Sequence, residues 1–269
     1  MERQPFFSCC ICGGEKYERL MTALVAPEGE AAFFSPEQYH KHIWRCSYCY
    51  HIAIMSPALE STGESIYAKC TYPEGPFVAY QRIVNLPLAE SDNAVRCQFI
   101  RQWRSHHRAR YSLMWALDIG SGLGVFPKAL EREGWCVRCV EPDLLLAEHL
   151  RSLGLTVEQA SREKPLAVGY DYHLISLVKV LEHVENPVAM LTEMREWATS
   201  ASLYIEVPDG EMAAKESLSR EEFFLPHKHA FSFTSLSILI QKARYVVEKI
   251  ERYRMPSGKY DVRAIVRAG

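Results

Sequence analysis

Three features that mark common classes of protein are missing from this sequence of 269 residues. It has no excess of positive charge, because 31 lysines and arginines face 33 aspartates and glutamates, and the formal net charge is −2. Such a balance provides no broad positive field for nucleic acid or for an anionic membrane. The sequence also has no apolar run long enough to span a bilayer, and its N-terminus lacks the apolar core of a signal peptide. We therefore expect a soluble, cytoplasmic protein with no membrane span, and the charge balance argues against nucleic acid as a partner.

Cysteine, by contrast, is abundant, and its spacing favours a metal site over disulfides. Nine cysteines are present, and Cys-x-x-Cys pairs in a cytosolic chain of this size are typical of metal ligands. Cys9 and Cys12 form one pair, and Cys46 and Cys49 form a second after a loop of about thirty residues, as in tetrahedral zinc sites. The pattern predicts that Zn²⁺ binds these four thiolates in a structural role, because no coordination position is left for a substrate. The alternative is four loop cysteines without a metal.

The neighbouring residues are weaker candidates for this site. Cys10 is adjacent to a ligand at the wrong spacing, so we interpret it as a bystander. A further pair, Cys136 and Cys139, lies in an expected strand, where residues three apart point to opposite faces and cannot chelate one ion. Three histidines are alternative ligands: His40, His42 and His51.

Composition and periodicity divide the chain into three segments. Residues 1–75 are rich in cysteine, proline and glycine, as expected of a small module that folds around its metal. Residues 76–112 form a helical linker or lid, in which the pattern from Ser91 to Arg110 predicts a helix with a solvated basic face. That face carries Arg96, Arg101, Arg104, Arg108 and Arg110, and the alternative is that some of these arginines contact an anionic substrate. In residues 113–269 strands and helices alternate, which predicts a doubly wound, mainly parallel α/β sheet with ligand at the carboxyl ends of its strands.

A glycine-rich turn follows the first strand of this third segment. In "ALDIGSGLGVF", residues 116–126, Gly120, Gly122 and Gly124 let a ligand approach the backbone closely. The third glycine of the dinucleotide fingerprint would fall on Val125, which weakens an NAD interpretation. Glu141 follows the loop by about twenty residues, at the end of the second strand, where an acid can accept ribose hydroxyls. The glycine loop and Glu141 together predict a nucleoside-binding site, but they do not show whether its ligand is NAD or S-adenosylmethionine.

Four stretches carry a resemblance to a known family. "LDIGSGLGVF", "VEPD", "YDYHLISLVKVLEHVENP" and "LYIEVPD" resemble, in order and spacing, the motifs of class I S-adenosylmethionine-dependent methyltransferases. "LEHVENP" and "HKHAFSFTSLSILIQKARY" resemble a bacterial group within that class that often modifies sugars, lipids or secondary metabolites, and several of its members carry an N-terminal module with Cys-x-x-Cys pairs. The resemblance implies a Rossmann-like, seven-stranded, mainly parallel sheet with an antiparallel last strand, a small N-terminal zinc-binding module, and S-adenosylmethionine and Zn²⁺ as cofactors.

The resemblance also implies roles for individual residues. The glycine loop would hold the methionine end of the cofactor, Glu141 and Pro142 would lie at its ribose, and the end of the fourth strand would lie under its sulfonium. The residues implied for the loop are Asp118, Gly120, Ser121, Gly122 and Gly124. Those implied for the fourth strand's end are Lys179, Leu181 and His183. No adenine contact is assigned, because residues 159–161 lack the aspartate that members often have there.

The acceptor is expected to be a small molecule or a sugar. An oxygen nucleophile must lose a proton, and histidine is the usual base at neutral pH, so His227 and His229 in "FFLPHKHAF" are the candidate catalytic residues. Asp209 and His183 are weaker candidates. Related sugar C-methyltransferases tend to have His-Glu-His where this chain has Lys228 in the middle, which favours O-methylation, with N-methylation next. Alternatives are an RNA base methyltransferase with a zinc module, and a non-catalytic protein that binds the cofactor or a partner.

Overall fold

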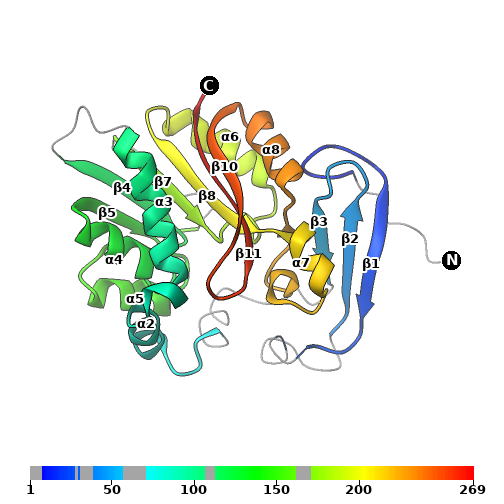
Figure 1. The fold of residues 1–269 in the computed structure, drawn as a ribbon, viewed down its shortest axis with the longest axis horizontal. Coiled ribbons are helices and arrows are strands. Elements are labelled where there is room, and N and C mark those ends of the chain that lie inside the picture. Colours follow the sequence, from blue (N-terminus) through cyan, green and yellow to red (C-terminus); the bar gives the residue numbers. More distant parts are fainter. Residues whose placement is uncertain (1–7, 28–29, 31–38, 57–70, 107–112, 162–170) are drawn as a thin grey trace.

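The computed structural model describes residues 8–27, 30, 39–56, 71–106, 113–161 and 171–269. These form two sheets flanked by helices (Figure 1). The larger sheet has the order β10-β11-β8-β7-β4-β5-β6. Its strands are β4 (Met114–Ile119), β5 (Trp135–Val140), β6 (Thr156–Glu158), β7 (Leu174–Val178), β8 (Ser202–Pro208), β10 (Tyr245–Arg254) and β11 (Tyr260–Ala268).

The direction of the strands confirms the predicted sheet. β4 pairs in parallel with β5 and β7, and the pairs β5–β6 and β7–β8 are also parallel. The last strand, β11, is antiparallel to both β8 and β10. The fold is therefore the Rossmann-like sheet with an inserted antiparallel last strand. Strands β4 and β7 lie at its centre and are almost entirely buried, as their apolar sequences predict.

Helices cover both faces of this sheet. The described helices are α2 (Pro76–Val84), α3 (Asp92–His106), α4 (Val125–Arg132), α5 (Leu144–Ser152), α6 (Pro187–Trp197), α7 (Gly210–Glu216) and α8 (Phe233–Lys242), with short 3₁₀ helices η2 (Leu88–Glu90) and η3 (Glu221–Phe223). Side chains of α3 and α4 pack in one core cluster with Tyr204, whereas those of α6 and α8 pack in another with Ile205. The two neighbours in β8 point to opposite faces, so each face has its own helical layer.

Capping residues in the sequence set where several helices begin. The hydroxyl of Ser91 accepts a hydrogen bond from the Ala94 amide, so α3 starts where the sequence predicted. Asn186 caps α6, with Pro187 in its first turn, and Ser232 forms a capping box with Ser235 at the start of α8. None of the helices in the described ranges is long and apolar enough to cross a membrane.

The smaller sheet contains the cysteine pairs and one strand from the other end of the chain. Its order is β1 (Tyr17–Ala23), β2 (Lys41–Cys46), β3 (Ile52–Met55) and β9 (His229–Ala230). β9 pairs antiparallel with β3, and Ile52 and Ala53 lie opposite Ala230 and His229. The N-terminal module is thus joined by backbone hydrogen bonds to the segment that carries the two candidate catalytic histidines.

Candidate active site and zinc centre

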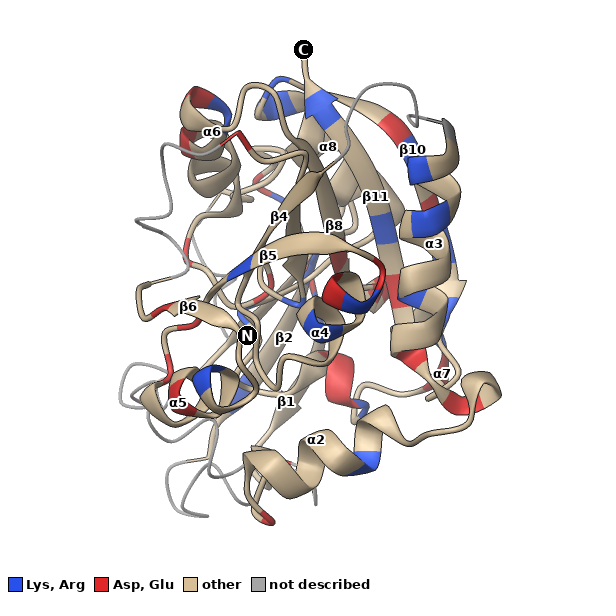
Figure 2. Cartoon of the chain, turned by 90° about the vertical axis from the view of Figure 1, so that its left-hand side faces the viewer, with Lys and Arg blue, Asp and Glu red and all other residues tan. Residues whose placement is uncertain are grey.

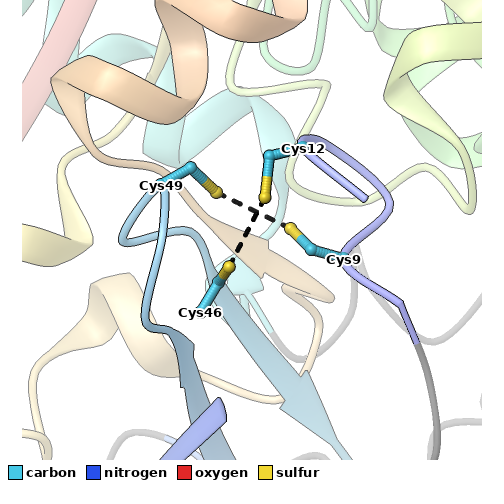
Figure 3. Close-up of side chains that lie close together, drawn as sticks. All are labelled: Cys9, Cys12, Cys46 and Cys49. Atoms are coloured by element: carbon cyan, nitrogen blue, oxygen red, sulfur yellow. Dashed lines mark hydrogen bonds between the residues drawn. The ribbon is translucent and has the colours of Figure 1, made fainter. Parts of the chain in front are cut away.

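The four predicted zinc ligands converge on one point between the ends of the N-terminal strands (Figure 3). The Sγ atoms of Cys9 and Cys49 are 3.6 Å apart, and those of Cys12 and Cys46 are 3.5 Å apart. A tetrahedral site with Zn–S bonds of about 2.3 Å places its sulfurs about 3.8 Å apart, so these distances fit Zn²⁺. The amide of Gly14 also donates a hydrogen bond to Cys12 Sγ at 3.3 Å, which favours a thiolate. The structure thus contains a Cys₄ cluster compatible with zinc.

The turns behind the two cysteine pairs both need a left-handed residue. Gly13 has a φ of 81°, as expected for glycine. Tyr50 holds the corresponding position of the second pair with a φ of 59°, which a residue with a Cβ adopts at some cost. Cys10 stays outside the cluster, and its Sγ lies 3.8 Å from His51 Nε2.

The glycine loop after β4 is built from left-handed residues and fastened to the end of β5. Gly120, Gly122 and Gly124 have φ values of 72°, 53° and 78°. A Cβ on Gly124 would lie 2.5 Å from a methyl of Leu150, so this glycine is needed for packing as well as for its conformation. The Gly122 amide donates to Glu141 Oε2 at 2.8 Å. Glu141, only 2% exposed, therefore joins the two elements that the sequence assigned to one nucleoside site.

A cavity of about 420 Å³ opens over this loop, within the size range of cofactor sites. Most of the predicted cofactor residues line it: Asp118, Gly120, Ser121, Gly122, Glu141, Lys179 and His183. Gly124, Pro142 and Leu181 are outside the lining, and Leu181 is buried in the core. The sequence did not identify the wall formed by α2 and its flanks or that formed by the β10–β11 turn, namely Tyr72, Arg82, Ile83, Leu86, Asn93, Ser257 and Lys259. The helical pattern of residues 76–112 was a signal for the first wall, whereas nothing local marks the second.

Asp118 forms part of the cavity floor and is almost fully buried. Burial raises its pKa to about 6, although the Ser176 hydroxyl donates a hydrogen bond to it at 2.5 Å. The Ser121 hydroxyl donates to the Asp118 carbonyl at 2.9 Å, which ties the loop to the strand. Asp118 therefore braces the turn and also faces the cavity.

Two ion pairs each contribute a residue, Arg96 or Lys179, to the cavity wall, and one pair corrects a prediction. Arg96 was expected on a solvated face, but its guanidinium contacts both carboxylate oxygens of Glu206 in β8, and its side chain is only 12% exposed. Burial alone would raise the pKa of Glu206, but Arg96 lowers it to about 2. Lys179 pairs in the same region with Asp261 of β11. Arg101 is largely exposed beside Glu133, as expected, whereas Arg104 is half-buried over the Trp135 ring and donates to the Glu133 carbonyl at 3.2 Å. Arg108 and Arg110 lie outside the described residues.

A cluster of one carboxylate and two imidazoles adjoins the cavity at Lys179. It consists of Glu182, His183 and His227, whose ligand-type atoms lie within 4.8 Å of one another. The two rings meet edge to face with centroids 4.9 Å apart. His183 Nδ1 lies 2.7 Å from the Pro226 carbonyl, and His227 Nδ1 lies 3.1 Å from the Glu222 carbonyl. Burial lowers the pKa of His227 to about 4, so its imidazole is neutral.

Glu182, the third member of this cluster, is the most unusual side chain of the site. It is 0% exposed, and neither carboxylate oxygen has a hydrogen-bond partner within the described part of the chain. Burial raises its pKa to about 8. Glu182 does not cap the helix that follows, because Asn186 caps α6.

The other predicted histidine, His229, lies on a different side of its segment. Its Nε2 is 2.9 Å from the Val184 carbonyl and its Nδ1 is 3.1 Å from His51 Nε2, so both ring nitrogens face protein atoms. It lines a second cavity of about 310 Å³ beside the zinc module. Asp209, a weaker candidate, caps α7 and pairs with Arg252 at 2.9 Å.

Comparisons with known proteins agree with this geometry. A family profile described as a methyltransferase domain matches residues 96–249. A magnesium protoporphyrin IX methyltransferase from Synechocystis PCC 6803, solved with bound SAH, is 12% identical, with a TM-score of 0.55 over 77% of this chain and 100% of its own. A protein from Pyrococcus horikoshii OT3 is 14% identical, with a TM-score of 0.50 over 70% and 99%. A comparison with curated proteins returned no match. The two solved proteins share the fold, and the family profile covers more than half of the sequence, so this chain belongs to the methyltransferase-domain family and is a class I S-adenosylmethionine-dependent methyltransferase.

Proposed function

We propose that this protein methylates an oxygen atom of a small molecule or a sugar, with S-adenosylmethionine bound in the 420 Å³ cavity. The observation that carries the proposal is the junction of the glycine loop and β5, where Glu141 accepts the Gly122 amide within the cavity wall. In this arrangement Glu141 accepts the ribose hydroxyls, and the loop amides and Asp118 face the methionine end. Lys179 and His183 then lie at the opposite wall, beside the methyl group.

Methyl transfer to oxygen requires two things of the protein: it must align the acceptor with the methyl group, and it must allow one proton to leave. S-adenosylmethionine supplies a methyl group on a positively charged sulfur, and the acceptor oxygen displaces that sulfur in line. Holding two reacting groups in alignment can supply about 7–11 kcal/mol of a barrier. A hydroxyl must also lose its proton, whereas a neutral amine already offers a lone pair. The cluster of Glu182, His183 and His227 lies where that proton would leave, which favours oxygen as the acceptor atom.

Of the two predicted catalytic histidines, our proposal retains His227 and gives no catalytic role to His229. His227 directs Nδ1 to a carbonyl, which accepts only, so the lone pair of its neutral ring is on Nε2. His183 is oriented in the same way and also lines the cofactor cavity. Both nitrogens of His229 are engaged within the protein, beside the second cavity.

We further propose that the Cys₄ cluster binds Zn²⁺ and that the zinc module supports the acceptor side of the active site. The segment from η3 to β9 is attached to this module at several points. The Ile54 amide donates to the Lys228 carbonyl at 2.9 Å, and the Ser232 hydroxyl donates to the Cys49 carbonyl at 2.6 Å. Folding of the cysteine turns would therefore position the residues on either side of His227 and His229.

The first test combines cofactor binding with label transfer. We expect Glu141→Ala to weaken S-adenosylhomocysteine binding by about tenfold or more in titration calorimetry, because a buried hydrogen-bonding partner of the ribose and of the loop is lost. Glu148→Ala, an exposed change in α5, is the matched control and should leave affinity unchanged.

Label transfer from methyl-labelled S-adenosylmethionine into a fractionated cell extract then tests the acceptor class. We expect label in the small-molecule or glycan fraction with the wild-type protein and none with Glu141→Ala. Label confined to RNA would refute the proposed acceptor. In Figure 2, α4 and α5 each carry both positive and negative residues, which supports the small-molecule expectation.

A further inference from the structure

We propose that Glu182, His183 and His227 bind a divalent first-row transition-metal cation, which in turn binds and activates the acceptor hydroxyl. The proposal deepens the proposed function and rests on it for the identity of the acceptor group. The three residues offer two imidazole nitrogens and one carboxylate oxygen, a donor set that suits Zn²⁺, Fe²⁺ or Mn²⁺. Three protein ligands leave coordination positions open for an acceptor oxygen.

The orientation of both imidazoles is that of metal ligands. Metal-binding histidines typically donate one ring N–H to a carbonyl or carboxylate, which fixes the tautomer and leaves the other nitrogen as the ligand. His183 and His227 each direct Nδ1 to a backbone carbonyl, of Pro226 and of Glu222. Nε2 of each ring therefore carries the lone pair that a cation needs.

The surroundings of Glu182 call for a positive charge. A fully buried carboxyl group without a hydrogen-bond partner is costly in its charged form, so in folded proteins such groups hold a proton, are paired or bind metals. The buried charges nearby are the pairs Arg96–Glu206 and Lys179–Asp261, in which each carboxylate already has its cation. Glu182 has no ion pair of its own, and the nearby cation that acts on it, Lys179, already pairs with Asp261. A cation between Glu182 and the two imidazoles would supply the missing charge.

The position of the cluster connects it with methyl transfer. His183 and Lys179 line the cavity assigned to the cofactor, so a cation bound by His183 would lie at its edge. A hydroxyl bound to such a cation has a lowered pKa and loses its proton to water, so His227 acts here as a ligand of the cation and not as the base. The resulting oxyanion forms a bond to the methyl carbon, the carbon–sulfur bond breaks, and its electron pair returns to sulfur. No electron transfer is needed, so any of the three cations can serve.

The test is a Mn²⁺ titration of protein whose Cys₄ site already holds zinc, confirmed by elemental analysis after dialysis against a weak chelator. Mn²⁺ favours nitrogen and oxygen ligands over thiolates, and electron paramagnetic resonance reports the free ion directly. We expect the wild-type protein to bind one Mn²⁺ per chain, and Glu182→Gln and His227→Ala to weaken this binding by about 10–100-fold or more. Glu185→Gln, the same chemical change on a side chain that is 77% exposed three residues later, is the matched control and should bind as the wild type does.

The results test the cation site and the proposed methyl transfer separately. Equal Mn²⁺ uptake by all four proteins, or none by the wild type, would overturn the cation site. Because Glu182→Gln could disturb folding, His227→Ala provides an independent measurement, and S-adenosylhomocysteine affinity checks that the cavity of each variant is intact. Full label transfer by protein without Mn²⁺ would overturn the role of the cation while leaving the proposed methylation in place. Failure to bind S-adenosylhomocysteine at all would instead refute the proposed function, whatever the Mn²⁺ count.

Discussion

The buried pair of Glu30 and Lys41 allows the link between the zinc module and the methyltransferase sheet to be tested. Both side chains are 0% exposed, and Lys41 Nζ lies 2.7 Å from Glu30 Oε2. Lys41 also donates to the Phe223 carbonyl at 3.1 Å, and Glu30 accepts the Leu225 amide. The pair thus joins the N-terminal sheet to the segment that leads into His227.

Replacing one partner should be far more harmful than its hydrogen bonds alone suggest. Lys41→Met preserves the volume and the apolar stem but leaves Glu30 as an uncompensated buried charge, which costs about 3–5 kcal/mol of unfolding free energy. The double variant Glu30→Gln/Lys41→Met removes that charge and retains an acceptor for the Leu225 amide. We expect it to be more stable than the single variant, even though it carries more substitutions.

The assay is urea unfolding followed by circular dichroism, with Lys16→Met as a control because Lys16 is exposed in the same module. The control should change the unfolding free energy by less than about 0.5 kcal/mol. S-adenosylhomocysteine affinity should be preserved in the folded Lys41→Met variant, since the pair lies outside the cavity lining. A loss below about 1 kcal/mol for Lys41→Met, or a double variant less stable than the single one, would refute the reasoning.

Three further predictions concern the second ion pair, the glycine loop and the zinc content. Arg96→Met should lower the unfolding free energy by about 3–5 kcal/mol, because Glu206 loses its buried partner. Arg101→Met should be nearly neutral, because Arg101 is largely exposed. Equal effects of the two substitutions would contradict the buried position of Arg96. Gly124→Ala should lower the melting temperature more than Gly154→Ala. Both glycines have positive φ, but only a Cβ at position 124 would clash, with Leu150. The reverse order of melting temperatures would contradict the packing at the glycine loop. Elemental analysis should find about one zinc per chain, and Cys46→Ser should reduce that content and destabilise the N-terminal sheet; unchanged zinc would exclude the Cys₄ site.

The parts of the fold that the sequence predicted are those specified by local patterns. The apolar sequences of β4 and β7 predicted buried strands, and the pattern beginning at Ser91 predicted a helix start, because a cap acts within three residues of its own position. The glycine loop was recognisable because its three residues with positive φ favour glycine, which tolerates that conformation. The two Cys-x-x-Cys pairs were predicted to meet at one metal site because each has the spacing of zinc ligands.

The parts that the sequence missed depend on partners distant in the chain. Arg96 has the spacing of a solvated face, and only the presence of Glu206, 110 residues later, turns it into a buried pair. β9 is two residues long and exists only because β3 offers its edge, so no periodicity could reveal it. Ser257 and Lys259 reach the cavity through the β10–β11 turn, which no local pattern identifies as part of its wall.

The two histidines of "PHKH" show why spacing alone could not assign their roles. Both His227 and His229 were predicted as candidate catalytic residues, although residues two apart in an extended segment need not keep the same surroundings once one of them joins a sheet. β9 instead pairs with β3 at His229, which directs that ring to His51 in the N-terminal module, while the turn before it directs His227 to His183. The same short segment therefore contributes one imidazole to the zinc-module side and one to the cofactor side. The N-terminal module also contacts the segment before His227, through Lys41 at the Phe223 carbonyl and Glu30 at the Leu225 amide. A perturbation of the Cys₄ cluster can therefore reach both histidines, whereas the glycine loop lies on the other sheet, so partial loss of zinc should impair methyl transfer before it impairs binding of S-adenosylhomocysteine.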